Sequence, residues 1–319
     1  MTYTEQQRQH HISLAQNTDI FNNTPAGVIF RNTARPYILI DSTHNLHESC
    51  RQQALDYFAA NGISWWQLEQ AAKSPTGHLL SSQIACINHL FPIRNNKEAV
   101  VQLLKTIDPD FSDVAIIESD TPETQGYIAF EAVCAGNYLN ENNFTRGANA
   151  TSVDALIIGK KADGKNILVT IEWKYTESYS VGEKSDKSRN RSGEIRRARY
   201  DKLIADSKYL KNSYTEVYYF EPFYQLMRQT LFAEQMVANN YTGCTSFINI
   251  HVIPAGNKEL LKPGKHKYSI NGRVGSLKEL WTEQLECPGM YKTISPEELL
   301  ATQPEPCEWK DYLRVRYWQ

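Results

Sequence analysis

The stretch that decides the fold runs from Thr151 to Glu177 and reads TSVDALIIGKKADGKNILVTIEWKYTE. Two apolar, β-branched runs at 151–158 and 167–174 flank the turn-forming sequence ADGKN at 162–166. This pattern predicts a β-hairpin, because β-branched residues favour strands and Asp-Gly favours a turn.

Both predicted strands carry charged residues among apolar ones. Successive side chains of a strand point to opposite faces, so Glu172 and Lys174 are expected on the face opposite Trp173. Asp154 stands in the same situation on the first strand, directly before the apolar run 155–158. A buried acid is costly unless it has a charged partner or a metal. The hairpin therefore predicts either an ion-paired cluster, with Lys174 neutralising both acids, or a metal site.

Asp154, followed across a hairpin by Glu172-Trp173-Lys174, resembles the metal site of the PD-(D/E)XK, or restriction-endonuclease-like, nuclease superfamily. The resemblance implies an α/β fold in which helices flank a mixed central sheet, with the core order αβββαβ over about 81–254. Residues 1–80 are then expected to form a mostly helical N-terminal extension. Residues 81–319 would form the nuclease domain with a C-terminal extension.

The resemblance also implies roles for the residues of the hairpin. Asp154 and Glu172 would coordinate Mg²⁺, or Mn²⁺ in its place, together with the backbone carbonyl of Trp173, because these cations prefer oxygen ligands. The metal would polarise the scissile phosphate and lower the pKa of a bound water. Lys174 would position that water or balance the charge that builds up on the phosphoryl oxygens.

The sequence does not identify the third acid of this metal site as directly. The first helix of the superfamily core often lends an acid to the metal site, but the equivalent position here holds Gln83 or Asn88. Either this helix contributes an amide that orients water, or the acid comes from elsewhere. Glu131, in the predicted strand 127–133, is the best candidate, and its alternative is an ion pair with Arg146 or Lys174.

A helix is predicted to start at Pro222, since proline fits the first turn. Gln225 lies one turn into it. The segment is similar to the Gln-x-x-x-Tyr helix of the RecB-like branch of the superfamily, with Gln229 in place of the Tyr. Gln225 is therefore either a residue that lines the site or part of an exposed helix surface.

The net charge is −2, but the stretch 184–202, directly after the hairpin, has a local excess of Lys and Arg. Such residues supply the phosphate contacts of a DNA-binding protein. The alternative is a solvated loop and an exposed helix face. The candidate DNA contacts are Arg146, Arg189, Arg191, Arg196, Arg197 and Arg199.

Two other patterns are interpreted as packing. Glu308-Trp309-Lys310 repeats the tripeptide but lacks a preceding apolar strand with an acid. His44-x-x-His47-x-x-Cys50 has ligand-like spacing, but a structural zinc site needs four ligands and no neighbouring pair completes it.

Periodicity outlines the remaining elements. Helices are expected at 46–61, 81–107 with a break near Pro92, 194–210, 222–239, 277–285 and 296–301. Strands are expected at 216–220 and 245–253, and the runs 27–30 and 37–40 could be a hairpin or extended connections. The polar segment 4–16 is expected to be frayed.

These observations predict a metal-dependent DNA endonuclease of a restriction or defence type. The alternatives are a RecB-like exonuclease or junction-cleaving nuclease, and a non-catalytic nucleic-acid-binding protein that retained the fold. Neither a long apolar run nor a signal-like segment occurs, so the protein is expected in the cytoplasm, without a membrane partner. Cutting both strands of DNA usually requires two active sites, which favours a homodimer.

Overall fold

The structure is a computed structural model. It describes residues 1–30, 32–67, 70–119, 121, 124–134, 136–141, 150–179, 182–185, 192–262, 268–305 and 307–319.

The predicted hairpin is present. Its strands are β7 (Ser152–Lys161) and β8 (Asn166–Trp173), which pair antiparallel. Gly164 adopts a left-handed φ of +85° in the turn, which glycine tolerates because it has no Cβ. The hairpin therefore forms where its local turn chemistry predicts it.

The hairpin is the centre of a mixed six-stranded sheet with the order β12-β9-β8-β7-β5, in which β6 also pairs with β7. On one side of the hairpin, β9 (Cys244–Val252) pairs parallel to β8, and β12 (Tyr291–Ile294) pairs parallel to β9. On the other side, β5 (Phe111–Ala115) and β6 (Ala129–Val133) both pair antiparallel to β7.

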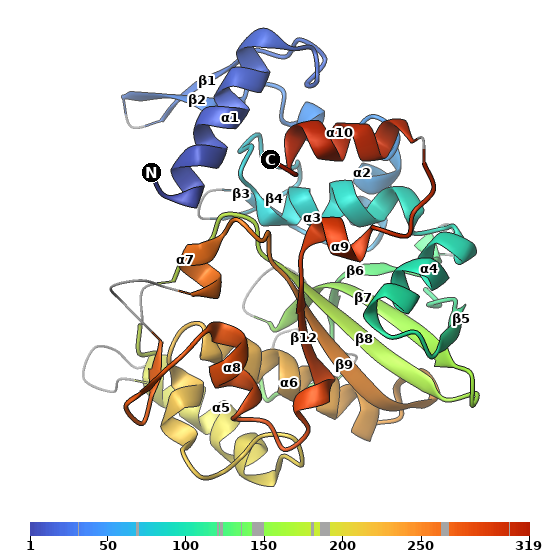
Figure 1. Ribbon diagram of the computed structural model, residues 1–319, viewed down its shortest axis with the longest axis vertical. Coiled ribbons are helices and arrows are strands. Elements are labelled where there is room, and N and C mark those ends of the chain that lie inside the picture. The colour runs from blue at the N-terminus through green and yellow to red at the C-terminus, as the bar shows by residue number, and fades with distance from the viewer. Residues whose placement is uncertain are drawn as a thin grey trace.

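Helices cover both faces of this sheet (Figure 1). One face packs against α3 (Ser82–Leu90), α4 (Lys97–Ile107) and α10 (Glu308–Arg316), and the other against α5 (Ser192–Asp206), α6 (Phe223–Ala238) and α8 (Leu277–Thr282). Alternate residues of the hairpin enter the two cores: Ile157 and Val169 face the first, and Ile158 and Leu168 the second. The predicted mixed α/β architecture with a helix-flanked central sheet is confirmed.

The expected break at Pro92 is also confirmed. A short 3-10 helix (Phe91–Ile93) separates α3 from α4, and the side chain of Asn96 caps α4 by accepting from the Ala99 amide at 3.1 Å. Proline interrupts the helix because it lacks an N–H donor and its ring clashes with the preceding turn.

The first 80 residues contain helices α1 (Tyr3–Asn17) and α2 (Arg51–Ala60) and two hairpins, β1 (Ala26–Phe30) with β2 (Thr33–Leu39) and β3 (Trp65–Gln67) with β4 (Gln70–Ala72). The hairpin interpretation of 27–40 is thus confirmed. The expectation that 4–16 is frayed was wrong. Gln7 and His11 are buried in α1 because both hydrogen-bond the Tyr175 hydroxyl, at 2.6 and 2.8 Å.

The strand predicted at 216–220 was wrong as well. Thr215–Tyr219 is a 3-10 helix, although its residues favour strands. Three consecutive side chains there, Val217, Tyr218 and Tyr219, are buried, and a strand could not place all three on one face. The Phe220 amide instead bonds locally to the Val217 carbonyl at 3.1 Å.

Element bounds elsewhere differ modestly from expectation. The helix expected from 46 begins at Arg51, and α5 ends at Asp206, where Glu234 binds Ser207 and Lys208. Strands β5 and β12 had not been predicted. The remaining short elements are α7 (Lys258–Leu261), α9 (Pro296–Leu299), β10 (Ser269–Ile270), β11 (Arg273–Val274) and the 3-10 helices Ser42–Asn45, Tyr241–Gly243 and Pro288–Met290. Among the described residues, no helix has the length and apolar character needed to cross a bilayer.

Candidate active site

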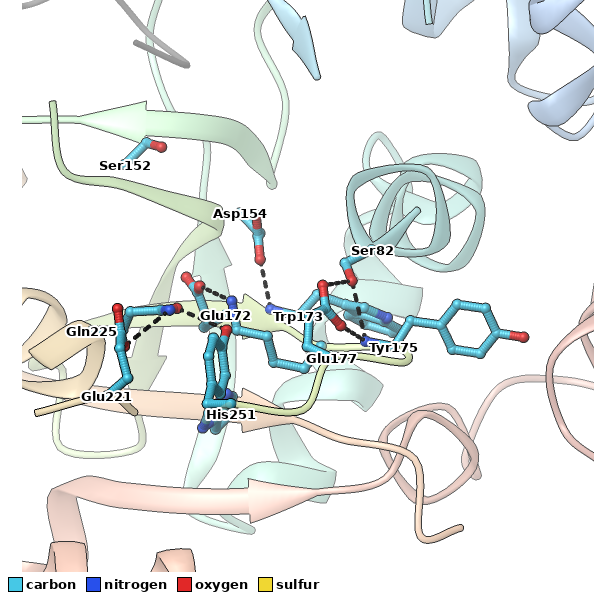
Figure 2. A network of polar contacts seen from close by, with 12 residues as sticks. Ser82, Ser152, Asp154, Glu172, Trp173, Tyr175, Glu177, Glu221, Gln225 and His251 are labelled. Atoms are coloured by element: carbon cyan, nitrogen blue, oxygen red, sulfur yellow. Dashed lines mark hydrogen bonds and ion pairs between the residues drawn. The ribbon is translucent and has the colours of Figure 1, made fainter. Parts of the chain in front are cut away.

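The charged residues of the hairpin meet where the two strands stop pairing. The ladder between β7 and β8 ends at Ala155 and Ile171, so Asp154 and Glu172 lie just beyond it. The Trp173 amide donates to Asp154 Oδ2 at 2.6 Å, and Lys174 Nζ contacts Glu172 Oε1 at 2.7 Å (Figure 2). The structure therefore brings Asp154 against Glu172-Trp173-Lys174.

Glu131 joins this group from β6. Its neighbours Phe130 and Ala132 pair with Ala155 and Val153 of β7, which leaves Glu131 opposite Asp154. Glu131 has a φ of +48°. The left-handed region is sterically unfavourable for a residue with a Cβ, and such strained residues cluster at functional sites. The backbone is thus strained at Glu131.

Gln83 of α3 holds the Glu131 carboxylate. Gln83 Nε2 donates to Glu131 Oε1 at 2.6 Å, and Ser152 Oγ donates to Oε2 at 3.1 Å. Of the two ion-pair partners considered for Glu131, Lys174 instead contacts Glu172, and Arg146 lies outside the described residues. The amide of the first helix and the acid of the strand, which the sequence offered as alternatives, therefore form one pair.

Asn88, the other amide considered on α3, faces elsewhere. It is fully buried, accepts from the His47 amide at 2.8 Å and donates to the Tyr317 hydroxyl at 2.9 Å. These contacts tie α3 to the N-terminal segment and to the end of the chain. Gln83 is the amide that faces the acids.

Burial and like charges shape the electrostatics of these groups. Burial, followed by the nearby Glu172 and Glu131 carboxylates, raises the pKa of Asp154 well above its ordinary value. Burial is also the main reason why the pKa of Glu131 is raised. For Lys174, burial favours the neutral amine, but the charges of Glu172, Glu177 and Asp154 and the nearby Tyr179 outweigh it and hold the pKa well above the ordinary value. The surrounding charges thus favour the protonated form of Lys174.

These residues line a cleft of about 640 Å³. We call Glu131, Asp154 and Glu172 its acidic cluster, and Lys184, Arg196, Arg199 and Arg228 its basic cluster; Glu177 and Glu221 line the cleft as well, and Glu221 contacts Lys184 at 3.3 Å. Gln225 of α6 also lines the cleft, where it donates to Glu221 Oε2 at 3.3 Å and accepts from the Tyr179 hydroxyl at 3.2 Å (Figure 2). Of the two interpretations of Gln225, the structure agrees with the one in which it lines the site.

The six arginines predicted as DNA contacts separate into three groups. Arg196 and Arg199 of α5 line the cleft. Arg197, between them, is not among the lining residues and instead contacts Glu216 at 2.6 Å and Asp201 at 3.8 Å. Arg146, Arg189 and Arg191 lie outside the described residues.

Arg228 is a cleft residue that no sequence motif singled out. Its Nε donates to Thr151 Oγ1 at 2.9 Å, and its NH2 group contacts Glu141 Oε1 at 3.3 Å. Burial works against the charge, but the nearby Tyr200, Tyr224 and Glu141 raise the pKa of the guanidinium. The signal that could have found it is helical spacing, because Arg228 follows Gln225 by about one turn of α6 and so shares its face.

The donor groups fit an oxygen-preferring divalent cation. Asp154 and Glu172 are partly accessible from the cleft, and Glu131 and Glu172 add to the negative field that raises the pKa of Asp154. A dication relieves such repulsion, and carboxylate and carbonyl oxygens are its usual ligands. In the arrangement seen across the described residues, however, no three His, Cys, Asp or Glu side chains are already gathered as ligands around one point.

The two motifs interpreted as packing do pack. Trp309 lies in α10 and donates from Nε1 to the Asn88 carbonyl at 2.7 Å, while Lys310 Nζ donates to the Gln303 carbonyl at 3.0 Å. His44 contacts Thr24, and His47 Nδ1 contacts Ser49 Oγ at 2.7 Å. Neither motif lines the cleft.

One comparison with known proteins gives a match. Residues 9–318 match the family model described as "Restriction Endonuclease associating with ARP". No curated protein matches the chain, and no solved structure does.

Proposed function

The chain belongs to this family of restriction endonucleases, and from that premise we propose that it is a metal-dependent DNA endonuclease of the PD-(D/E)XK type, with Asp154, Glu172 and Lys174 as its catalytic residues. The observation that carries the proposal is the convergence of these three residues and Glu131 in one cleft that also has a basic cluster. A restriction endonuclease acts on DNA, and phosphates need cations beside the acids that would hold a metal.

Asp154, Glu172 and the Trp173 carbonyl would hold Mg²⁺ or Mn²⁺, with Glu131 as the third acid. The bound ion would polarise the scissile phosphate and lower the pKa of an attacking water. Lys174 is buried, touches Glu172 and keeps its proton because its pKa is raised. It would therefore supply positive charge to the phosphoryl oxygens, where negative charge increases in the transition state.

Gln83 and Ser152 fix the Glu131 carboxylate by donating to its two oxygens. Glu177 performs a similar task at the end of β8, where it accepts from the Tyr175 amide at 2.7 Å and from the Ser82 hydroxyl. The bonds from Gln83 to Glu131 and from Ser82 to Glu177 both join α3 to the strands that carry the acids. Positioning of this kind contributes to rate because reacting groups must be held in a productive geometry.

The test is a nicking assay on supercoiled plasmid with Mg²⁺ or Mn²⁺, together with calorimetry of metal binding. Asp154→Asn, Glu172→Gln and Lys174→Met should each lower the cleavage rate by about 100-fold or more, the usual effect of removing a group that stabilises transition-state charge. Asp154→Asn should also weaken metal binding. Asp163→Asn and Lys165→Met are matched controls, because these residues pair with each other at 2.7 Å in the turn of the same hairpin.

The outcomes separate the proposal from its rivals. A closed circle has no ends, so nicking of it excludes a pure exonuclease, whereas degradation of linear DNA alone would favour the RecB-like alternative. Linearisation in a single binding event would favour a homodimer with two active sites. DNA binding without cleavage of duplex, single-stranded or branched DNA in either metal would contradict the proposal and favour the binding protein.

A further inference from the structure

One aromatic side chain stands out at the cleft. Among the residues whose side chains the structure describes, Trp66 is the only Phe, Tyr or Trp that is exposed, with 54% of its surface accessible. It also lines the cleft that holds the acidic and basic clusters. Exposing an indole forfeits the free energy that burial of its apolar area would give, so a solvent-facing tryptophan beside a site is a candidate contact.

The backbone of Trp66 is held firmly. Its neighbour Trp65 on β3 is buried and stacks on Phe58, with ring centroids 3.8 Å apart and an interplanar angle of 14°. Since side chains alternate along a strand, fixing the indole of Trp65 inward turns that of Trp66 outward. The Trp66 amide also donates to Gln83 Oε1 at 3.0 Å. The exposed indole is therefore presented by an anchored strand.

The same contact links the backbone of Trp66 to the acids. Gln83 accepts from the Trp66 amide and donates to Glu131 Oε1 at 2.6 Å, so one side chain joins Trp66 to the acidic cluster. A phosphate next to these carboxylates would be repelled unless a cation intervened. A neutral base would not be repelled, and stacking of its π-face on tryptophan would stabilise it.

We propose that Trp66 is a stacking platform for one nucleobase of the bound DNA strand, placed beside the acidic cluster. This inference rests on the proposed nuclease function and narrows its substrate. In an intact duplex both faces of each base are covered by neighbouring bases, so stacking on Trp66 requires a base that has left the stack. The cleft would therefore take DNA with an unstacked base, in a single strand, at an end or displaced from a duplex.

Intrinsic fluorescence can test this contact selectively. Of the six tryptophans, Trp65, Trp173, Trp281 and Trp309 are buried and Trp318 is partly buried, so Trp66 is the one open to a stacked base. The experiment titrates wild-type protein with single-stranded oligo-deoxythymidylate and, in parallel, with an intact closed duplex. In these titrations Ca²⁺ replaces Mg²⁺, because Ca²⁺ also takes oxygen ligands. Anisotropy of labelled DNA measures binding independently.

Binding of the single strand should quench the fluorescence, and Trp66→Phe, which keeps a π-face, should retain most of the affinity. Trp66→Leu keeps an apolar side chain without a π-face and should weaken binding of the single strand by about 5- to 160-fold, the range of base stacking on an aromatic ring. The dependence of affinity on salt should be unchanged in both variants, because no charge is removed. Val274→Ala is the control, since Val274 is 52% exposed and does not line the cleft.

Binding without quenching, or Trp66→Leu binding the single strand as tightly as wild type, would overturn the inference. If Trp66→Leu leaves DNA binding and cleavage intact but weakens capture of a protein partner, the indole is a protein contact and the inference is again wrong. Failure of the nuclease proposal looks different: wild-type protein would bind DNA, with or without quenching, and cleave none in Mg²⁺ or Mn²⁺.

Discussion

At the scale of single residues, the cleft holds groups in unfavourable states, through like charges and backbone strain. Asp154 lies near two other acids that raise its pKa, and Glu131 has a left-handed backbone. The sequence could predict that Asp154, Glu172 and Lys174 lie together, because charged residues inside apolar strands are conspicuous. It could not predict the bond from Gln83 to Glu131, which depends on how α3 packs on β6. Nor could it separate Arg196 from Arg197, because only the fold decides which of them meets Glu216.

The first prediction concerns the stability cost of the acidic cluster. Because the folded-state pKa of Asp154 is raised, the native state favours its protonated form, and that stabilisation is lost as pH rises through the folded-state pKa. At pH 8 without metal, Asp154→Asn should therefore be more stable than wild type. Its free energy of unfolding should be higher by about 1 kcal/mol, and it should unfold at a higher temperature. Asparagine can still accept from the Trp173 amide.

Thermal and chemical denaturation measure this difference, with Asp163→Asn as the control. Asp163 is exposed in the hairpin turn, so its replacement should change stability little. Equal or lower stability of Asp154→Asn would show that repulsion among the acids does not weaken the fold.

At the scale of elements, the hairpin, the break at Pro92 and β9 could be predicted, because each depends on turn chemistry or on alternation within its own segment. Helix α1 could not, since its buried Gln7 and His11 are stabilised by Tyr175, far away in sequence. The strand prediction at 216–220 was wrong for a related reason. Tertiary burial overrode a composition that favours strands, and the segment formed a 3-10 helix. Edge strand β12 pairs with β9 on one side and has four residues, too few for a clear pattern.

Helix α5 offers a prediction within one element. Arg196 and Arg199 line the cleft, and each donates to a backbone carbonyl, of Lys184 at 2.8 Å and of Glu141 at 3.2 Å. Among the described residues neither arginine contacts a carboxylate, so their positive charges are open to phosphates. Arg197 is instead neutralised by Glu216 and Asp201. Replacing Arg196 or Arg199 with Gln should weaken DNA binding and reduce the slope of log affinity against log salt by about 0.9 for each phosphate that is no longer neutralised.

Arg197→Gln is the matched control, one residue away on the same helix. Fluorescence anisotropy over a salt series measures all three variants. An equal reduction of slope in Arg197→Gln would mean that charge density along α5, and not the cleft, determines DNA binding.

At the scale of the whole molecule, the two ends of the chain are packed together around buried polar groups. Arg316 is fully buried and donates at 2.8 Å to the Asn45 carbonyl, while His10 Nε2 contacts the Val315 carbonyl at 2.9 Å. Several histidines are buried in the same way. Burial is the main cause that lowers the pKa of His89 and His251 to about 3 and that of His78 to about 4.

These histidines predict acid sensitivity. Their folded-state pKa values lie below the unfolded value of about 6.5, so unfolding takes up protons once the pH falls below that value. Stability is thus full above about pH 6.5 and declines toward the folded-state values. Between pH 7.5 and 5.5, each buried histidine should remove about 1.4 kcal/mol of unfolding free energy. Denaturant titrations at both pH values measure the decline.

His89→Phe and His78→Phe isolate single contributions. Each variant is compared with itself at the two pH values, so that its general loss of packing cancels. The pH-dependent loss of unfolding free energy should shrink by about 1.4 kcal/mol in each variant relative to wild type. An unchanged loss in both would assign the acid sensitivity to other groups.

The pair formed by Gln83 and Glu131 has a consequence for how such sites are compared. A carboxylate and an amide meet in the cleft, the amide from a helix and the carboxylate from a strand. Their hydrogen bond would survive if the two side chains traded places, because either partner can be supplied from either segment. Equivalent chemical groups are then identified by their positions in space and not by their positions in an aligned sequence. A search that demands an acid on the first helix would pass over this chain, although an acid from β6 meets that helix through Gln83.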